Sequence, residues 1–285
     1  MGGLGTVALV EQTTTVLIDD LGFPEAPRWH GGRFWFSDFH DRVVRSASPS
    51  GEVTVELELD DSPSGLGWAP DGDLLVVSMT RRALLRVRDG VPRLHADLTG
   101  RTRFRANDLV VDTAGRAYVS SFGFDLEAGA PPEPTELLRV DPDGSVHVAA
   151  PDVVFPNGMV LSPDGATLVV AETYGARLTA FDVAEDGGLS GRRVFADLPG
   201  VAPDGICLDA EGQVWVATAR TPEVLRVRDG GAITARVAVG TGSLSYACAL
   251  GGEDGRTLAV CTAPSWRPGP RAGRIEVARV EVPAA

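Results

Sequence analysis

Short apolar segments bounded by turn residues recur along most of the chain. Residues 64–72, 157–165 and 204–212 share one arrangement, in which a polar residue precedes a short apolar segment and a glycine follows eight positions later. A second short segment, rich in β-branched residues, follows each glycine, as at 74–77 and 167–170. Short runs of this kind, separated by Gly, Pro and Asp, predict β-strands joined by tight turns.

This arrangement recurs six times, at intervals of 39 to 50 residues, with an offset of eight in five repeats and of seven in the first. Within each interval a third strand, a turn and a fourth strand follow the first two. Four strands in a period of about 40 to 45 residues are typical of one blade of a β-propeller. The sequence therefore predicts an all-β fold, a six-bladed β-propeller with four antiparallel strands in each blade. We call the first residues of the six repeats the anchors: Glu25, Ser64, Asn107, Asn157, Asp204 and Ala247.

The two ends of the chain complete this count of strands. Residues 247–282 supply three strands of the last blade, and residues 14–18 supply one strand ahead of the first anchor. We expect the N-terminal strand to pair with the C-terminal blade, which would close the ring and remove both sheet edges. The prediction is one domain over residues 1–285, with 1–13 as a flexible or loosely packed segment. An open β-sandwich of six hairpins is the alternative, but it gives no reason for the fixed offset between anchor and glycine.

Composition and charge narrow the classes of function. The 26 Lys and Arg against 39 Asp and Glu give a formal net charge of −13, and an acidic protein repels nucleic acid. No window approaches the run of about 18 apolar residues that spans a membrane. The three cysteines lack the paired spacing of a zinc or redox site. We expect a cytoplasmic protein, monomeric or weakly oligomeric, with no nucleic-acid or membrane partner.

The anchors carry the candidate chemistry. The first strand of each blade lines the central channel of a propeller, so the anchors should point toward one another. Two carboxylates and two carboxamides would then meet at the axis, and the carboxylates would repel unless a cation lay between them. Oxygen ligands suit Ca²⁺, Mg²⁺ or Mn²⁺, and the lack of His and Cys weakens but does not exclude Zn²⁺. The alternative is that these side chains only cap turns.

Four motifs, in this order, resemble the SMP-30/regucalcin/gluconolactonase family of six-bladed propellers. They are FPEAPRW (23–29), RAND (105–108), FPNGM (155–159) followed by SPDG (162–165), and PDG (203–205). The resemblance covers nearly the whole chain. The chain departs from the family pattern at Ala26, where glycine is usual, and at Glu172, where aspartate is usual.

The resemblance implies particular roles for the anchors and their neighbours. One divalent ion, most favourably Ca²⁺, would be held by Glu25, Asn157 and Asp204. Asn107 would reach the ion directly or through water and help to hold the substrate, and Arg105 would also contact the substrate. The predicted catalytic residues are Asp204, Glu25 and Arg105.

The activity that the resemblance implies is metal-dependent hydrolysis of a lactone, with sugar lactones as the default substrate. The ion would polarise the ester carbonyl, and Asp204 would accept a proton from the attacking water. Arg105 would orient the ring through paired hydrogen bonds. Two alternatives remain open. The same metal propeller could act on a phosphotriester or a ring compound of specialised metabolism, or the chain could be a binding propeller whose ion is structural.

The longest interval follows Asn107 and marks an insertion at 122–134. We expect this segment to form a lid or wall at the channel mouth, with Phe122 and Phe124 as candidate substrate contacts, although an ordinary surface loop is the alternative. The histidines are expected in turns or outer strands, away from the channel: His30, His40, His95 and His147.

Overall fold

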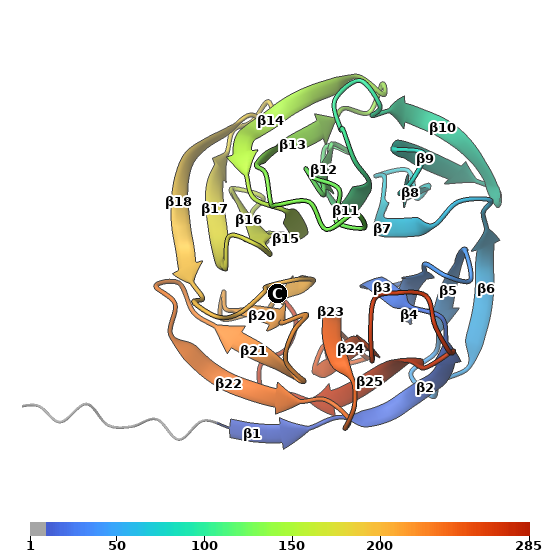
Figure 1. The fold of residues 1–285 in the computed structure, drawn as a ribbon, viewed down its shortest axis with the longest axis vertical. Coiled ribbons are helices and arrows are strands. Elements are labelled where there is room, and N and C mark those ends of the chain that lie inside the picture. Colours follow the sequence, from blue (N-terminus) through green and yellow to red (C-terminus); the bar gives the residue numbers. More distant parts are fainter. Residues whose placement is uncertain (1–9) are drawn as a thin grey trace, which may run out of the picture.

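The computed structural model describes residues 10–285, which fold into six sheets arranged around a central axis (Figure 1). Within this range the chain forms strands and turns and no helix, and hence no helix that could cross a membrane. Each sheet forms one blade with four antiparallel strands, one blade carries an additional strand, and the blades follow one another around the ring in chain order. The predicted six-bladed β-propeller is confirmed.

In the first three blades the strands run outward from the axis in chain order. Blade 1 consists of β3 (Pro24–His30), β4 (Arg33–Asp38), β5 (Val43–Ala47) and β6 (Val53–Glu58). Blade 2 consists of β7 (Pro63–Trp68), β8 (Leu74–Ser78), β9 (Ala83–Arg88) and β10 (Val91–Asp97). Blade 3 consists of β11 (Ala106–Val111), β12 (Ala117–Ser121), β13 (Thr135–Val140) and β14 (Val146–Val153).

The last three blades repeat this order, and the sixth takes its outer strand from the N-terminal part of the chain. Blade 4 consists of β15 (Pro156–Leu161), β16 (Thr167–Glu172), β17 (Arg177–Val183) and β18 (Leu189–Asp197). Blade 5 contains β19 (Ile206–Leu208), β20 (Val214–Ala217), β21 (Glu223–Val227) and β22 (Ile233–Ala238). Blade 6 consists of β23 (Leu244–Gly251), β24 (Thr257–Ala263), β25 (Gly273–Arg279) and β2 (Thr15–Leu21).

The ring closes as the sequence predicted. Strand β2 pairs antiparallel with β25, with Thr15 opposite Val277. One pairing was not foreseen: β1 (Val10–Thr13) runs parallel to β22 and adds a fifth strand to blade 5. The sequence analysis assigned residues 10–13 to a flexible or loosely packed segment; in the structure they pair with a strand more than 200 positions away. The rest of that segment, residues 1–9, lies outside the described residues.

Apolar side chains fill each of the six interfaces between neighbouring blades. Between blades 2 and 3, for example, Leu84, Leu109 and Leu138 are fully buried. Because burial of a leucine side chain contributes about 1.5 to 3 kcal/mol, these interfaces account for most of the stabilisation. The polar residues at the axis are therefore available for chemistry rather than for holding the fold together.

The inner strands approach one another closely at the glycines that follow three of the anchors. A Cβ atom on Gly158 would lie 2.7 Å from the backbone nitrogen of Ile206 and 2.8 Å from the carbonyl oxygen of Asp204. The absence of a side chain lets the Gly158 amide donate to that same carbonyl, at 3.2 Å. Glycine at this position therefore fixes the separation between Asn157 and Asp204.

Buried carboxylates at the ends of two second strands hold the backbone just ahead of two anchors. Asp38, at the end of β4, accepts hydrogen bonds from the amides of Gly22 and Phe23, at 3.0 and 2.8 Å. Glu172, at the end of β16, accepts from the amide of Val154 at 2.8 Å and pairs with Arg177 at 2.9 Å. The aspartate-to-glutamate departure at 172 thus lies in a buried structural network that supports the entry into β15.

Candidate active site

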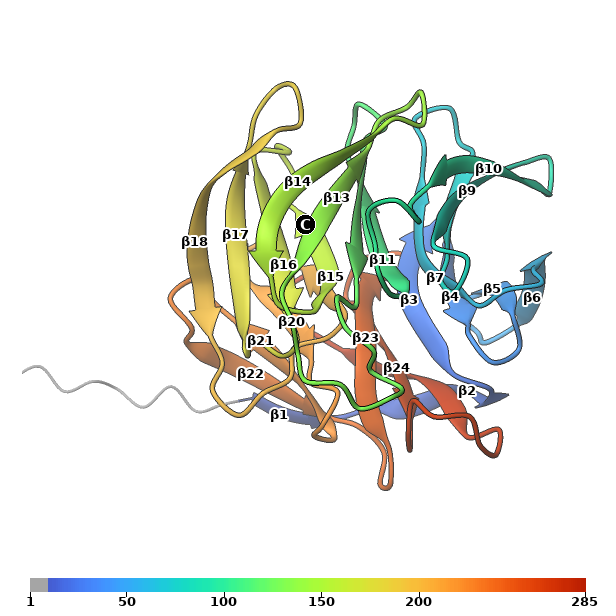
Figure 2. The same cartoon turned by 45° about the horizontal axis from the view of Figure 1, so that its top comes forward.

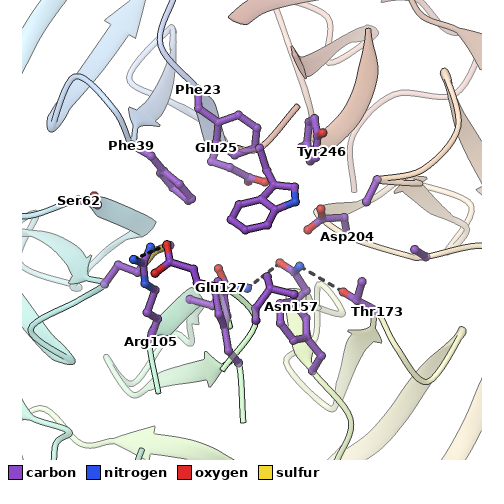
Figure 3. A pocket seen from close by; sticks show the side chains of 18 of the residues that line it. Phe23, Glu25, Phe39, Ser62, Arg105, Glu127, Asn157, Thr173, Asp204 and Tyr246 are labelled. Carbon is purple, nitrogen blue, oxygen red and sulfur yellow. Dashed lines mark hydrogen bonds and ion pairs between the residues drawn. The ribbon is translucent and has the colours of Figure 1, made fainter. Parts of the chain in front are cut away.

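Four of the six anchors line one cavity of about 480 Å³ at the end of the channel. Glu25 lies on β3, Asn107 on β11 and Asn157 on β15, while Asp204 lies two residues before β19. Figure 3 shows Glu25, Asn157 and Asp204 directed toward a common space. The remaining anchors, Ser64 and Ala247, are buried but are not part of the cavity lining. The structure therefore brings together the four residues that the sequence proposed as metal ligands.

A chain of hydrogen bonds orients the side-chain amide of Asn157. The Thr173 hydroxyl donates to the carbonyl oxygen of Pro203 at 2.8 Å, so its remaining capacity toward Asn157 is that of an acceptor. Asn157 accordingly donates its amide nitrogen to Thr173 at 3.2 Å. Its amide oxygen is turned the other way, where it accepts from the amide nitrogen of Asn107 at 3.0 Å and keeps a second lone pair available.

The two anchor carboxylates of the cavity, Glu25 and Asp204, are destabilised in their charged forms. The pKa of Glu25 is raised to about 8, chiefly by burial; the charge of Asp108 acts in the same direction, whereas the hydrogen bond from the Ala26 amide and the charge of Arg28 oppose it. Burial also raises the pKa of Asp204 well above its usual range, and the charges of Glu25 and Asp108 add to this effect. Neither Glu25 nor Asp204 forms an ion pair with any of the described residues. A cation between them would relieve both the desolvation and the repulsion.

The donor set fits a hard divalent cation by its chemistry. It combines two carboxylates with two carboxamides, one of which is held with its oxygen free to accept. Carboxylate and amide oxygens are the ligands that Ca²⁺ and Mg²⁺ prefer. Within residues 10–285 no group of three or more His, Cys, Asp or Glu side chains is arranged to hold a metal. Any ion held here would therefore depend on the asparagines as well as on the carboxylates.

An ion pair near the axis was not foreseen from the sequence. Arg28 on β3 donates to the carboxylate of Asp108 on β11 at 2.7 Å and to the carbonyl oxygen of Leu109 at 2.8 Å. This contact joins blades 1 and 3 across the channel. Both residues belong to the family motifs, but the ion pair between them joins strands that lie 80 positions apart in the sequence. Arg28 partly compensates the charge of Asp108, whereas Glu25 and Asp204 have no ion-pair partner among the described residues.

The backbone conformation of Ala26 shows how the chain accommodates alanine where the family usually has glycine. Its φ of 48° lies in the left-handed region that favours glycine. In this conformation its amide donates to the Glu25 carboxylate at 2.7 Å. The chain thus keeps the backbone geometry of a glycine at the cost of local strain, and the side chain of Glu25 is held by its own neighbour.

The insertion at 122–134 forms part of the cavity wall. It connects β12 to β13, and Phe122, Leu126 and Glu127 line the cavity. Figure 2 shows this loop and the loop between β24 and β25 extending from the same side of the ring. Arg105 also lines the cavity, and its guanidinium pairs with Glu127 at 2.7 Å (Figure 3). The predicted substrate-binding arginine is therefore held by the insertion itself.

Phe122 and Phe124 occupy different positions. Phe122 lines the cavity and stacks on Phe155, with ring centroids 4.7 Å apart. Phe124 is not part of the lining and is only 2% exposed, since it packs behind, against Phe155 and Tyr174. Its position supports the neighbouring rings rather than direct contact with a substrate.

The expectation that every histidine lies away from the channel is wrong for His40. This residue follows β4, lines the cavity, and its Nε2 lies 3.2 Å from the carbonyl oxygen of Trp266. The loop that carries Trp266 folds back over the site, which the blade pattern alone could not reveal. Among the described residues, His40 forms no hydrogen bond or ion pair with a carboxylate or a second histidine, as a catalytic dyad would require.

Sequence comparison places the chain in one family. Residues 23–264 match the family described as SMP-30/Gluconolactonase/LRE-like region. A pentonolactonase from Haloferax volcanii is 30% identical over 246 residues, which cover 84% of this chain and 81% of that protein. A 6-deoxy-6-sulfogluconolactonase from Pseudomonas putida is 29% identical over 260 residues, covering 88% of this chain and 87% of that protein.

The solved structures agree with this assignment. A calcium-binding protein, regucalcin, from Agrobacterium tumefaciens matches with a TM-score of 0.81 and 25% identity, covering 97% of each chain. The family match spans all four of the cavity-lining anchors. The chain therefore belongs to the SMP-30/gluconolactonase/LRE-like family.

Proposed function

We propose that the chain is a lactonase, a hydrolase that opens a lactone ring with the help of one divalent metal ion. The observation that carries this proposal is the convergence of Glu25, Asn157 and Asp204 on one open cavity without a cationic partner among the described residues. The names of relatives that match over most of the chain support the reaction. The solved calcium-binding relative supports the ion.

Three anchors would hold the ion: Glu25, Asn157 and Asp204. Asn107 would reach it directly or through water. Ca²⁺ suits the all-oxygen donors best, while Mg²⁺, Mn²⁺ and Zn²⁺ remain candidates. When bound, a divalent ion acts as a Lewis acid that polarises the ester carbonyl and favours negative charge on its oxygen.

The side chains around the cavity supply the remaining steps. Asp204 accepts a proton from the water that attacks the carbonyl carbon, and returns it to the ring oxygen as the bond between that oxygen and the acyl carbon breaks. The product is a hydroxy acid, one opened chain with a carboxylic acid and a hydroxyl group, and the acid then releases its proton to solvent to give the carboxylate. Arg105, steadied by Glu127 at 2.7 Å, donates hydrogen bonds that orient the ring. Glu25 contributes the second negative charge that keeps the ion in place.

Acid release from a panel of lactones tests the proposed reaction directly. The panel includes sugar lactones, the class named for the relatives, together with simple γ- and δ-lactones and one phosphotriester. We expect acid release from at least one lactone, saturable in substrate, and none from the phosphotriester. Absence of hydrolysis with Ca²⁺, Mg²⁺, Mn²⁺ and Zn²⁺ supplied in turn would contradict the proposal and favour a binding propeller.

Thr173 should act on metal binding through Asn157. Thr173→Val removes the acceptor that fixes the Asn157 amide, so the amide can turn its nitrogen toward the ion. Loss of such supporting hydrogen bonds typically weakens metal binding about 10- to 100-fold, and we expect a loss of about tenfold by calorimetric titration. Thr54→Val, on the outer strand β6, is the matched control and should leave the affinity unchanged. Equal affinities in the two variants would contradict this role.

A further inference from the structure

Aromatic side chains line the cavity in two groups that face each other across the channel. The first group belongs to blades 1 and 6, and the second to blades 3 and 4. In a ring of six blades, blade 1 lies opposite blade 4 and blade 6 lies opposite blade 3. We call them the first and second aromatic groups: Phe23, Phe39, Tyr246 and Trp266 form the first, and Phe122, Phe155 and Tyr174 the second.

Contacts within each group hold its rings in place. In the first group, the rings of Phe23 and Tyr246 meet edge to face at 4.7 Å, and Phe39 lies 5.4 Å from Phe23. Figure 3 shows these three rings on one side of the carboxylates. Trp266 packs against the same group, and its carbonyl oxygen is in contact with His40.

The second group is built in the same way. Phe155 stacks on Phe122 at 4.7 Å and meets Tyr174 edge to face at 5.2 Å, with Phe124 closing the back. The buried rings are Phe23 and Tyr246 in the first group and Phe155 in the second. The other rings are only half-buried: Phe39 and Trp266 in the first group, and Phe122 and Tyr174 in the second. Both groups therefore present partly open aromatic faces to one cavity.

Several polar groups of the cavity are engaged already, although Arg42, Ser62 and Arg220 also line it. Thr173 and Asn107 are bonded to Asn157, and Arg105 is paired with Glu127. A sugar lactone carries several hydroxyl groups, and each needs a partner because an unsatisfied buried polar group costs about 1 to 3 kcal/mol. The aromatic faces offer no such partners. They offer instead apolar area, whose burial stabilises a bound ligand.

We propose that the preferred substrates are lactones with an alkyl or aryl substituent on the ring, held between the two aromatic groups. This inference rests on the proposed lactonase function. The lactone ring lies at the carboxylates, and the substituent extends between Trp266 on one side and Phe122 on the other. A cavity of about 480 Å³ falls in the range of pockets that enclose drug-sized ligands, so it has room for both parts.

A series of γ-lactones with growing alkyl chains tests the substrate class. The series runs from γ-butyrolactone through methyl, propyl and pentyl derivatives, with an aryl derivative and D-glucono-1,5-lactone for comparison, each with the activating ion. We expect kcat/KM to rise by about fourfold for each added methylene group, as expected for burial of hydrocarbon. The pentyl and aryl lactones should exceed the sugar lactone.

Variants locate the effect in the aromatic groups. Trp266→Ala and Phe122→Ala should each lower kcat/KM for the pentyl lactone about tenfold more than for γ-butyrolactone, because only the longer substrate loses apolar contact. The matched control is Trp68→Ala, whose ring stacks on His30 at the far end of the inner strands. It should leave the chain-length dependence unchanged, and thermal melting shows whether each variant folds.

Binding of carbocyclic ketones gives a readout that needs no turnover. We expect 2-pentylcyclopentanone to bind at least about tenfold more tightly than cyclopentanone by calorimetry. If glucono-1,5-lactone were preferred and the alkyl series were flat, the inference would be overturned while the lactonase proposal stood. If no lactone were hydrolysed but the pentyl ketone bound selectively, the lactonase proposal would fall and the apolar preference of the cavity would stand. Equal binding of both ketones would also overturn the inference.

Discussion

Asp204→Asn is expected to lower kcat/KM for lactone hydrolysis by about three orders of magnitude. The change keeps the shape of the side chain but removes its negative charge and its ability to accept a proton from water. General-base catalysis alone contributes about 10²- to 10⁴-fold, and a weakened hold on the ion adds to the loss. Initial rates of acid release at saturating metal measure the effect.

The fold should survive this substitution. Asp204 lies at the central axis and not in the apolar interfaces between blades. Its carboxylate is buried and has a raised pKa, so its replacement by a neutral amide removes a destabilising charge. We therefore expect a melting temperature equal to or above that of the unmodified protein. Asp164→Asn, in an exposed turn where the carboxylate bonds only to its own turn, is the control and should retain full activity. Near-normal activity of Asp204→Asn would remove this residue from the mechanism.

Glu25→Gln should weaken metal binding by about 100-fold. The carboxylate of Glu25 is one of the two anchor carboxylates in the cavity, and its pKa of about 8 reflects burial without an ion-pair partner among the described residues. Glutamine preserves the contact with the Ala26 amide, so that the loss reports on charge rather than on the local backbone. Electrostatic attraction to a divalent ion is strong where water is excluded, which is why one charge has so large an effect.

Titration with Ca²⁺ by calorimetry measures the change, and activity at increasing Ca²⁺ should show a matching shift in the concentration that gives half-maximal rate. Glu58→Gln, at the end of the outer strand β6, carries the same charge change on an exposed side chain and serves as the control. An unchanged affinity in Glu25→Gln would exclude Glu25 from the metal site.

Features that repeat along the chain could be predicted from the sequence. The nearly constant offset between each anchor and its turn glycine reflects a hairpin of similar length in every blade. The positions of the inner strands and their order around the ring could therefore be predicted. Glu25, Asn107, Asn157 and Asp204 lie at matching positions of different blades, and the propeller necessarily brings matching positions together at the axis. The closing strand was predictable because blade 6 lacked its fourth strand.

Features that occur once could not be predicted in this way. The Arg28–Asp108 pair, the parallel strand β1 and the contact of His40 with the Trp266 loop each join segments far apart in the chain. Repeat analysis carries no information on such contacts. A weaker signal was present for the aromatic groups, since both Phe23 and Phe155 stand two positions before an anchor and just ahead of a proline.

The roles of supporting residues were also hidden in the sequence. Thr173 follows β16 and was not among the site residues predicted from the sequence, and its effect on Asn157 depends on the Pro203 carbonyl, which precedes the next blade. Glu172 differs from the family pattern by one methylene group, and it is fully buried and bonded to Arg177 on β17, to Arg192 on β18 and to the amide of Val154, between β14 and β15. These residues act through neighbours, so only the folded arrangement reveals them.

Removal and replacement of the metal tests the central claim most directly. The purified protein is treated with a chelator, dialysed and assayed for acid release from its best lactone, before and after addition of Ca²⁺, Mg²⁺, Mn²⁺ or Zn²⁺ in turn. The account predicts that activity disappears on chelation, returns with at least one ion at a stoichiometry of about one per chain, and does not return in Asp204→Asn. Full activity in the chelated, metal-free protein would contradict it.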